Sequence, residues 1–149
     1  MNAPLFNLQS SGLCVRSVAG SDIHLADFRG QKLALFFCPA DLSAAAREVD
    51  EYRTSADAFE RSGVWLIGIV PGELATDFAK DSAGHHLCIA HDPAGELRSR
   101  LRSLTSAAGQ GGDGETEGVT FLFDRWGNLT GFWNGAGHAR DALRVAETR

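Results

Sequence analysis

The chain has 149 residues, of which 44% are hydrophobic and 22% charged, and its formal net charge is −5 at pH 7. These values are ordinary for a globular protein, so we expect a single domain over residues 1–149. The acidic balance argues against a nucleic-acid or anionic-membrane surface, because both require clustered lysine and arginine. No apolar run is long enough to span a membrane, and the N-terminal residues do not resemble a signal peptide, so the sequence predicts a cytoplasmic protein.

The first half of the chain predicts two short strands, a buried strand and a long helix. Short strands are expected at 13–18 and 23–25, with a glycine turn between them. The five residues from Leu33 to Phe37 have no polar break, which is typical of a strand buried on both faces. Pro39 ends this strand because it cannot donate to the ladder. A helix of about 19 residues is expected from Ser43, since apolar side chains recur three and four apart. They are Ala45, Val49, Tyr52, Ala56 and Phe59.

The second half continues the alternation of strands and helices. Buried strands are predicted at 64–70, 87–90 and 119–123, and the last leads through a hairpin to a strand at 129–133. Helices are predicted at 74–78, 97–104 and 139–147. Residues 105–118 are rich in glycine, serine, threonine and acids, so a mobile loop is expected there. Together the elements predict an α/β sandwich with a mixed sheet.

Five short motifs follow one another in a fixed order. They are Ala-Pro-Leu-Phe-Asn-Leu at 3–8, Leu-Ala-Asp-Phe-Arg-Gly-Gln at 25–31, Ile-Gly-Ile-Val-Pro at 67–71 with a later Phe78, His-Asp-Pro-Ala-Gly-Glu at 91–96, and Thr-Phe-Leu-Phe-Asp at 120–124. In this order they resemble the peroxiredoxins, the alkyl hydroperoxide reductase and thiol-specific antioxidant family. The resemblance implies a thioredoxin-like three-layer sandwich, with helices on both faces of a mixed sheet, and thiol peroxidase chemistry without a cofactor.

The active-site signature of that family is Pro-x-x-x-Thr-x-x-Cys. Pro39 matches its proline, Ser43 retains the hydroxyl of its threonine, and Ala46 falls at the cysteine position. The family's arginine, expected just before the strand at 119–123, falls at Gly118. Alanine has no nucleophile, so the resemblance predicts a disabled site. A cysteine placed at 46 is expected in the helix's first turn, with a thiol pKa below the free value of about 8.5.

Cys38 is the alternative thiol at the same corner. It follows the buried strand rather than lying in the helix turn that lowers a thiol pKa, and packing is the commoner role of such a cysteine. Cys14 and Cys88 lie on predicted strands, and the three cysteines have no disulfide or Cys-x-x-Cys spacing. A second alternative is that Ala46 replaces a native catalytic cysteine.

Three further patterns have both a functional and an ordinary structural interpretation. His85, His86, Cys88 and His91 suggest a metal site, but strand alternation puts them on opposite faces, so we expect no metal. Gly-Gln-Gly-Gly-Asp-Gly at 109–114 matches a phosphate-loop pattern but follows a helix, and a flexible loop is favoured. Trp126 and Trp133 could form an interface patch, and packing within the hairpin is slightly favoured.

Three functions remain open, and the sequence does not decide whether the chain is an enzyme. The first is a redox-inactive binding or assembly module, with a protein partner or a homodimer surface. The second is an antioxidant thiol peroxidase that acts through Cys38, or through a native cysteine that Ala46 replaces. The third is a binder of a small peroxide-like ligand near Ser43. Nucleic acids and membranes are not expected as partners.

Overall fold

The structure is a computed structural model, which describes residues 14–18, 20–28, 30–39, 41–71, 87–92, 95, 97–101, 118–134 and 137–148. The N-terminal motif at 3–8, the helix predicted at 74–78, the glycine-rich motif at 109–114 and all but Gly118 of the loop predicted at 105–118 lie outside the described residues.

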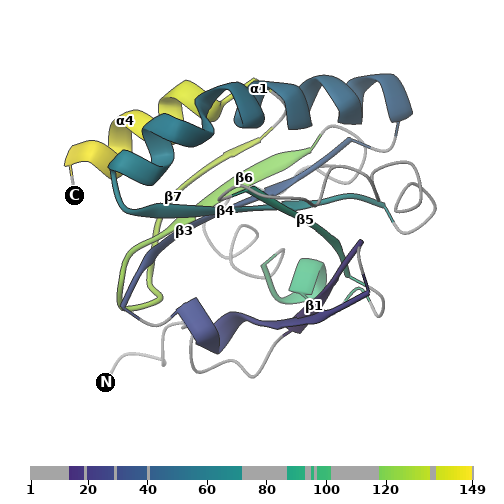
Figure 1. Cartoon of the computed structure of the whole chain (residues 1–149), viewed down its shortest axis with the longest axis horizontal. Coiled ribbons are helices and arrows are strands. Elements are labelled where there is room, and N and C mark those ends of the chain that lie inside the picture. Colours follow the sequence, from purple (N-terminus) through teal and green to yellow (C-terminus); the bar gives the residue numbers. More distant parts are fainter. Residues whose placement is uncertain are drawn as a thin grey trace.

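The described residues form one seven-stranded sheet with the order β2-β1-β5-β4-β3-β6-β7 (Figure 1). β3 is parallel to β4, and β4 to β5, whereas the other neighbouring pairs are antiparallel. The mixed sheet predicted from the sequence is therefore confirmed. The strands are β1 (Cys14–Ser17), β2 (Asp22–His24), β3 (Lys32–Phe37), β4 (Val64–Ile69), β5 (Leu87–His91), β6 (Val119–Phe123) and β7 (Leu129–Asn134).

The three strands with continuous apolar runs lie at the centre of the sheet. Leu35 of β3 faces Ile67 of β4 on one side and Phe121 of β6 on the other. All three side chains are buried in the core on one face of the sheet. The alternate residues Ala34, Leu66 and Leu122 enter a second core on the opposite face. Because neither face of these strands meets water, the predicted apolar runs are explained.

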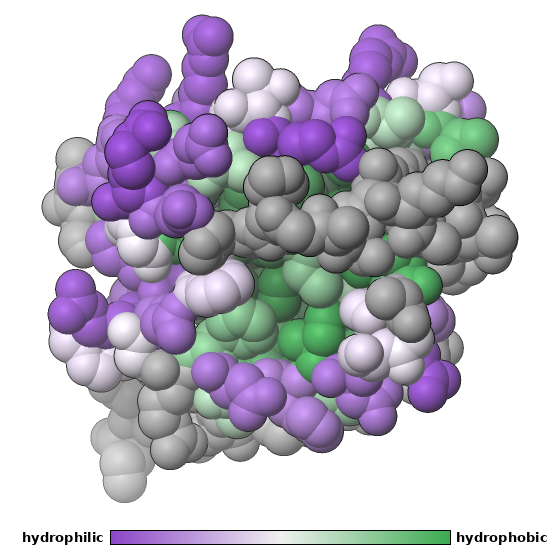
Figure 2. All heavy atoms as spheres, viewed as in Figure 1, coloured by the Kyte–Doolittle hydropathy of each residue, from purple (hydrophilic) through white to green (hydrophobic). Residues whose placement is uncertain are grey.

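Two long helices cover one face of the sheet. α1 (Leu42–Arg61) and α4 (Ala139–Thr148) lie above the strands in Figure 1 and contact one another. The five apolar residues predicted to face inward on α1 are all buried. In the space-filling view, hydrophilic side chains gather over the outer side of these helices, and apolar ones lie towards the middle of the molecule (Figure 2). The α1 prediction is confirmed, with the helix beginning one residue before Ser43.

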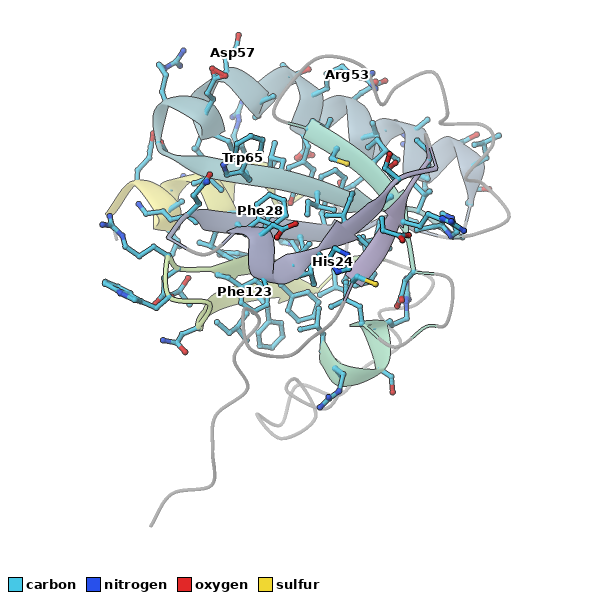
Figure 3. All side chains as sticks on the ribbon, turned by 60° about the horizontal axis from the view of Figure 1, so that its bottom comes forward. His24, Phe28, Arg53, Asp57, Trp65 and Phe123 are labelled. Atoms are coloured by element: carbon cyan, nitrogen blue, oxygen red, sulfur yellow. The ribbon has the colours of Figure 1, made fainter. Side chains whose placement is uncertain are left out.

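The other face of the sheet is covered by short elements. The 3₁₀ helix η1 (Leu25–Phe28) replaces the end of the predicted strand at 23–25, and residues 97–101 are helical. Leu25, Leu97 and Leu101 are buried in the core on this side. Figure 3 shows Phe28 next to Trp65, whose rings meet edge to face with centroids 5.9 Å apart. Helical residues on both faces confirm the three-layer arrangement.

Within the described residues, no helix has the length and apolar character needed to cross a membrane.

Candidate functional site

The candidate site is the corner between the end of β3 and the start of α1. Cys38 follows β3 directly, and its backbone N–H donates to the carbonyl of Ile69 at 2.7 Å, which continues the pairing with β4. The side chains of Cys38 and Pro39 are both buried. The chain leaves the sheet here and enters α1 within a few residues, so a rigid strand positions the N-terminus of the helix.

Asp41 caps α1. Its backbone is extended, and its carboxylate Oδ2 accepts a hydrogen bond of 3.0 Å from the backbone N–H of Ala44. This is the usual N-cap geometry, in which a side chain satisfies one of the free N–H groups of the first turn. The helix start predicted at Ser43 leaves this residue out, although an aspartate before an amphipathic run is a recognised start signal. The helix N-terminus therefore already holds an anion from its own chain.

Two of the predicted site residues lie on the first turns of α1. Ser43 is the second residue of the helix and is exposed, whereas Ala46 is the fifth residue and is partly buried. With 3.6 residues per turn, Ala46 belongs to the second turn, so its expected place in the first turn is wrong. The favourable field of a helix N-terminus falls off within the first turn, and it is therefore weaker at Ala46 than the sequence suggested.

Cys38 lies in an environment that disfavours a thiolate. Its side chain is 0% exposed. Burial, followed by the negative charge of Glu48, raises the pKa of the Cys38 thiol far above its ordinary value, and the charge of Arg98 opposes this only weakly. Arg98 lies with its guanidinium carbon 4.9 Å from the centre of the Phe37 ring. Cys38 is therefore a protonated, packed thiol at neutral pH.

Glu48 is a buried carboxylate on the same helix, with 2% of its surface exposed. Its Oε1 accepts a hydrogen bond of 3.0 Å from the backbone N–H of Gly137, while its Oε2 has no hydrogen-bond partner among the described residues. Burial is the main cause that raises the pKa of Glu48, and the Gly137 hydrogen bond acts in the opposite direction. Glu51, one turn further on, accepts from the N–H of Ala139 at 3.4 Å. The two carboxylates thus hold the start of α4 against α1.

Tyr52 connects α1 to β6, the strand that pairs with β3. Its hydroxyl and that of Thr120 are 2.5 Å apart in the core, and its ring stacks on Phe36 with centroids 3.9 Å apart. Burial raises the pKa of the Tyr52 hydroxyl, which therefore stays neutral. Each buried hydroxyl has the other as its partner, as buried polar groups require.

Gly118 precedes β6 and closes the corner from the other side. Its φ is +87°, and a Cβ placed there would lie 2.8 Å from the carbonyl oxygen of Phe37 and 3.3 Å from the ring of Pro39. Only glycine fits this conformation and this space. Gly118, which stands where the family has an arginine, is therefore required by its positive φ and by the close approach of Phe37 and Pro39.

The remaining candidates lie away from this corner. Cys14 is exposed on β1, and Cys88 is partly buried on β5, where burial raises its pKa. His85 and His86 lie outside the described residues, and the rest of the described chain holds no group of three or more ligands placed for a metal. Trp126 is 65% exposed, so the prediction that it packs within the hairpin is wrong. Trp133 packs against the core beneath α1 and α4.

The sheet, its helix layers and the strand-to-helix corner define a thioredoxin-like fold. The structure is similar to peroxiredoxin Q from Xanthomonas campestris, with a TM-score of 0.75 and 17% identity over 99% of this chain and 98% of the other. It is also similar to the bacterioferritin comigratory protein of Xanthomonas campestris, with a TM-score of 0.75 and 18% identity over 99% and 97% of the two chains. A mutant of PrxQ from Xylella fastidiosa matches with a TM-score of 0.73 and 16% identity over 99% and 98%.

The family model of the AhpC/TSA family matches residues 1–131. No curated protein matches the chain. Because the family model covers most of the sequence, the chain belongs to the AhpC/TSA family. This membership supports a thiol peroxidase-like, redox function at the level of the family, and the solved structures support the fold.

Proposed function

We propose that this chain is an AhpC/TSA family protein whose standard thiol peroxidase site is disabled, and that it acts as a binding or assembly module. One observation carries the proposal: Cys38, the thiol that adjoins the N-terminus of α1, is fully buried and holds its proton. Peroxide reduction needs a thiolate that peroxide can reach. Neither condition is met at Cys38, and Ala46 supplies no sulfur.

The charges around the corner support the same conclusion. Asp41 caps α1 with a carboxylate, and the charge of Glu48 on the second turn opposes a thiolate at Cys38. Gly118 cannot carry a cationic side chain in its present conformation. A thiolate at this corner would therefore meet negative charge on one side and no cation at 118 on the other.

The alternative is a thiol peroxidase that acts through Cys38, and one observation favours it. The positive charge of Arg98 lowers the pKa of Cys38, which is the direction that thiol chemistry requires. Burial acts more strongly in the opposite direction, so we rank this function second. The other form of the alternative, in which Ala46 replaces a native catalytic cysteine, predicts that Ala46→Cys gains peroxidase activity.

The partners remain part of the proposal. A protein partner or a second copy of the chain would need an exposed contact, and Trp126 at the β6–β7 turn offers an aromatic side chain that is 65% exposed. The guanidinium carbon of Arg125 lies 5.6 Å from the centre of its ring, which is the combination of residues often found at protein interfaces. We also propose a cytoplasmic location, and a small peroxide-like ligand near Ser43 stays an option.

Trapping of sulfenic acid tests the proposal. The purified chain is treated with one equivalent of hydrogen peroxide in the presence of dimedone, and each cysteine is then followed by mass spectrometry. We expect adduct first on the exposed Cys14 and none on Cys38 until the protein is unfolded. Rapid and selective adduct formation on Cys38 in the folded chain would support the peroxidase alternative instead.

A further inference from the structure

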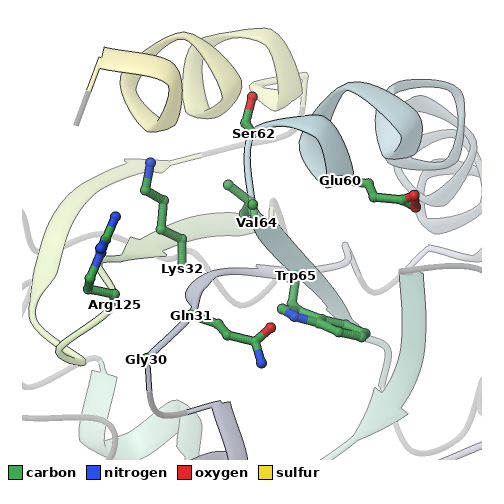
Figure 4. Close-up of a pocket in the computed structure, with 9 residues that line it drawn as sticks. Gly30, Gln31, Lys32, Glu60, Ser62, Val64, Trp65 and Arg125 are labelled. Carbon is green, nitrogen blue, oxygen red and sulfur yellow. The ribbon is translucent and has the colours of Figure 1, made fainter.

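A pocket of about 480 Å³ lies at the opposite end of α1 from Asp41 (Figure 4). Its walls come from the turn before β3, the end of α1, the start of β4 and the β6–β7 turn. The volume is within the range of small-molecule sites. At a rise of about 1.5 Å per residue, α1 separates this pocket from the Asp41 corner by about 30 Å, so the two places are distinct.

Lys32 supplies a cation that lacks a carboxylate partner in the described residues. Its Nζ donates one hydrogen bond of 2.8 Å to the carbonyl of Ala146, near the end of α4, and its side chain is partly buried. An ammonium group has three donors, so two remain for a ligand. A partly buried cation in a pocket favours an anion, because its charge is less well hydrated there than at an open surface.

Arg125 adds a second cation on the same side of the pocket. Its carbonyl accepts a hydrogen bond of 3.0 Å from the N–H of Gly30, which fixes the β6–β7 turn against the turn before β3. In Figure 4 the side chains of Lys32 and Arg125 extend in the same direction, whereas the carboxylate of Glu60 lies beyond Val64 and points away from them. Two cations therefore line the same pocket in a chain whose net charge is −5.

The rest of the pocket provides apolar surface. Trp65 lines the pocket with an indole that the edge-to-face contact with Phe28 holds in place, whereas Val64 is 1% exposed and offers a ligand almost no surface. Gly30 and Gly63 leave the walls open, since a Cβ at either residue would meet nothing within 4 Å. Lys32 and Trp65 point to opposite faces of the sheet, so a ligand that reaches both lies across the ends of β3 and β4.

We propose that this pocket binds a small organic anion, namely a carboxylate or a phosphate attached to a flat apolar group. Lys32 and Arg125 hold the anionic oxygens, and Trp65 contacts the apolar body. This site uses none of the cysteines and does not depend on the disabled thiol site. The competing explanation is purely structural: Lys32 only caps the last carbonyl groups of α4.

Titration of the isotope-labelled full chain by NMR separates the two explanations. The probes are phenyl phosphate, benzoate, neutral benzyl alcohol and inorganic phosphate, all at constant ionic strength. The variants are Lys32→Met, Lys32→Arg and Arg125→Met. Arg47→Met is the matched control, because Arg47 is an exposed cation at the opposite end of α1. Thermal unfolding of each variant shows that it is folded.

We expect saturable shifts at Gly30, Lys32 and Gly63 with at least one of the two aromatic anions, and binding at least about tenfold weaker for benzyl alcohol and inorganic phosphate. Lys32→Met and Arg125→Met should each weaken binding by about tenfold, while Lys32→Arg stays within about threefold and Arg47→Met has no effect. If Lys32→Met does not fold, Arg125→Met carries the same test.

Three results would overturn the proposal. The first is the absence of saturable shifts up to about 10 mM of either aromatic anion, which is weaker than a specific site of this size should be. The second is unchanged binding in Lys32→Met or Arg125→Met, which would leave Lys32 as a helix cap only. The third is an equal loss in Arg47→Met, because that would mean unspecific attraction to the whole chain.

Discussion

The carboxylate of Asp41 accepts a hydrogen bond of 3.0 Å from the backbone N–H of Ala44, so α1 begins with a negative charge of its own. In a thioredoxin-like fold this helix end is where a reactive thiolate gains stabilisation from free N–H groups and the helix dipole. Here one of those N–H groups is already occupied. The first turn of α1 is therefore stabilised as a helix start and is less suited to a second anion.

This relationship predicts how a thiol introduced at residue 46 should behave. In Ala46→Cys the thiol pKa should fall further when Asp41→Asn is added, by a few tenths of a unit, because asparagine still caps the helix but carries no charge. The thiolate ultraviolet absorbance as a function of pH measures it, with Cys14→Ser in both proteins to remove the exposed thiol. An unchanged or raised pKa in the double variant would show that Asp41 does not affect this position.

A pair of glycine substitutions measures how tightly the corner is closed. Gly118 and Gly30 both have φ of +87°, but a Cβ at Gly118 would lie 2.8 Å from the carbonyl oxygen of Phe37, whereas one at Gly30 would meet nothing within 4 Å. Gly118→Ala should therefore reduce the free energy of unfolding by about 1–3 kcal/mol more than Gly30→Ala does. Urea unfolding compares them, and equal losses would mean that the backbone relaxes without cost.

The hydroxyl pair of Tyr52 and Thr120 predicts a non-additive cycle. Tyr52→Phe removes one partner of the buried 2.5 Å hydrogen bond and should cost about 1–2 kcal/mol, since the Thr120 hydroxyl is left unsatisfied. Thr120→Val should cost a similar amount, and the double variant less than the sum of the two. Chemical unfolding of the four proteins gives the coupling. Strict additivity would mean that the hydroxyls do not depend on one another.

Glu48 predicts a pH dependence of stability. Because burial raises its pKa above the ordinary value of 4.5, the folded chain binds this proton more tightly than the unfolded chain. The stabilisation of the folded chain by protonated Glu48 is complete below the ordinary pKa of 4.5. It is lost as the pH rises through the raised pKa of the folded chain. The stability of Glu48→Gln relative to the unmodified chain should therefore increase as the pH rises from 4.5 through the raised pKa of Glu48.

The charged groups around Glu48 shift its pKa in both directions. Glu51 raises its pKa and His138 lowers it, and the ring of His138 is itself 2.9 Å from the carboxylate of Asp141. The control is Asp57→Asn, which removes an exposed carboxylate from the outer side of α1 (Figure 3). The same pH dependence in both variants would show that burial of Glu48 is not the cause.

The main elements of the fold could be predicted because their sequence patterns are local. The five apolar residues from Leu33 to Phe37 are by themselves sufficient to predict a strand buried on both faces. The spacing from Ala45 to Phe59 likewise defined the inner face of α1. The end of the strand at 23–25 was wrong because Leu25 enters a 3₁₀ turn, a choice that packing into the core decides rather than local propensity.

The site was harder to predict because its determinants come from distant segments. Glu48 is a polar residue next to Val49 in the sequence. No nearby residue indicates that the backbone N–H of Gly137, 89 residues away, donates a hydrogen bond to it. The proximity of Arg98 to Phe37 likewise arises only in the folded chain. Asp41 is different, since an aspartate before the amphipathic run is a local signal for the N-cap.

The most direct test of the central claim is the rate at which the purified, unmodified chain reduces hydrogen peroxide, measured by stopped flow beside Cys38→Ser and Ala46→Cys. A disabled site predicts a rate no higher than that of a free exposed cysteine, and no change in Cys38→Ser. Rapid peroxide consumption by the unmodified chain that Cys38→Ser abolishes would contradict the account and identify Cys38 as the peroxidatic thiol.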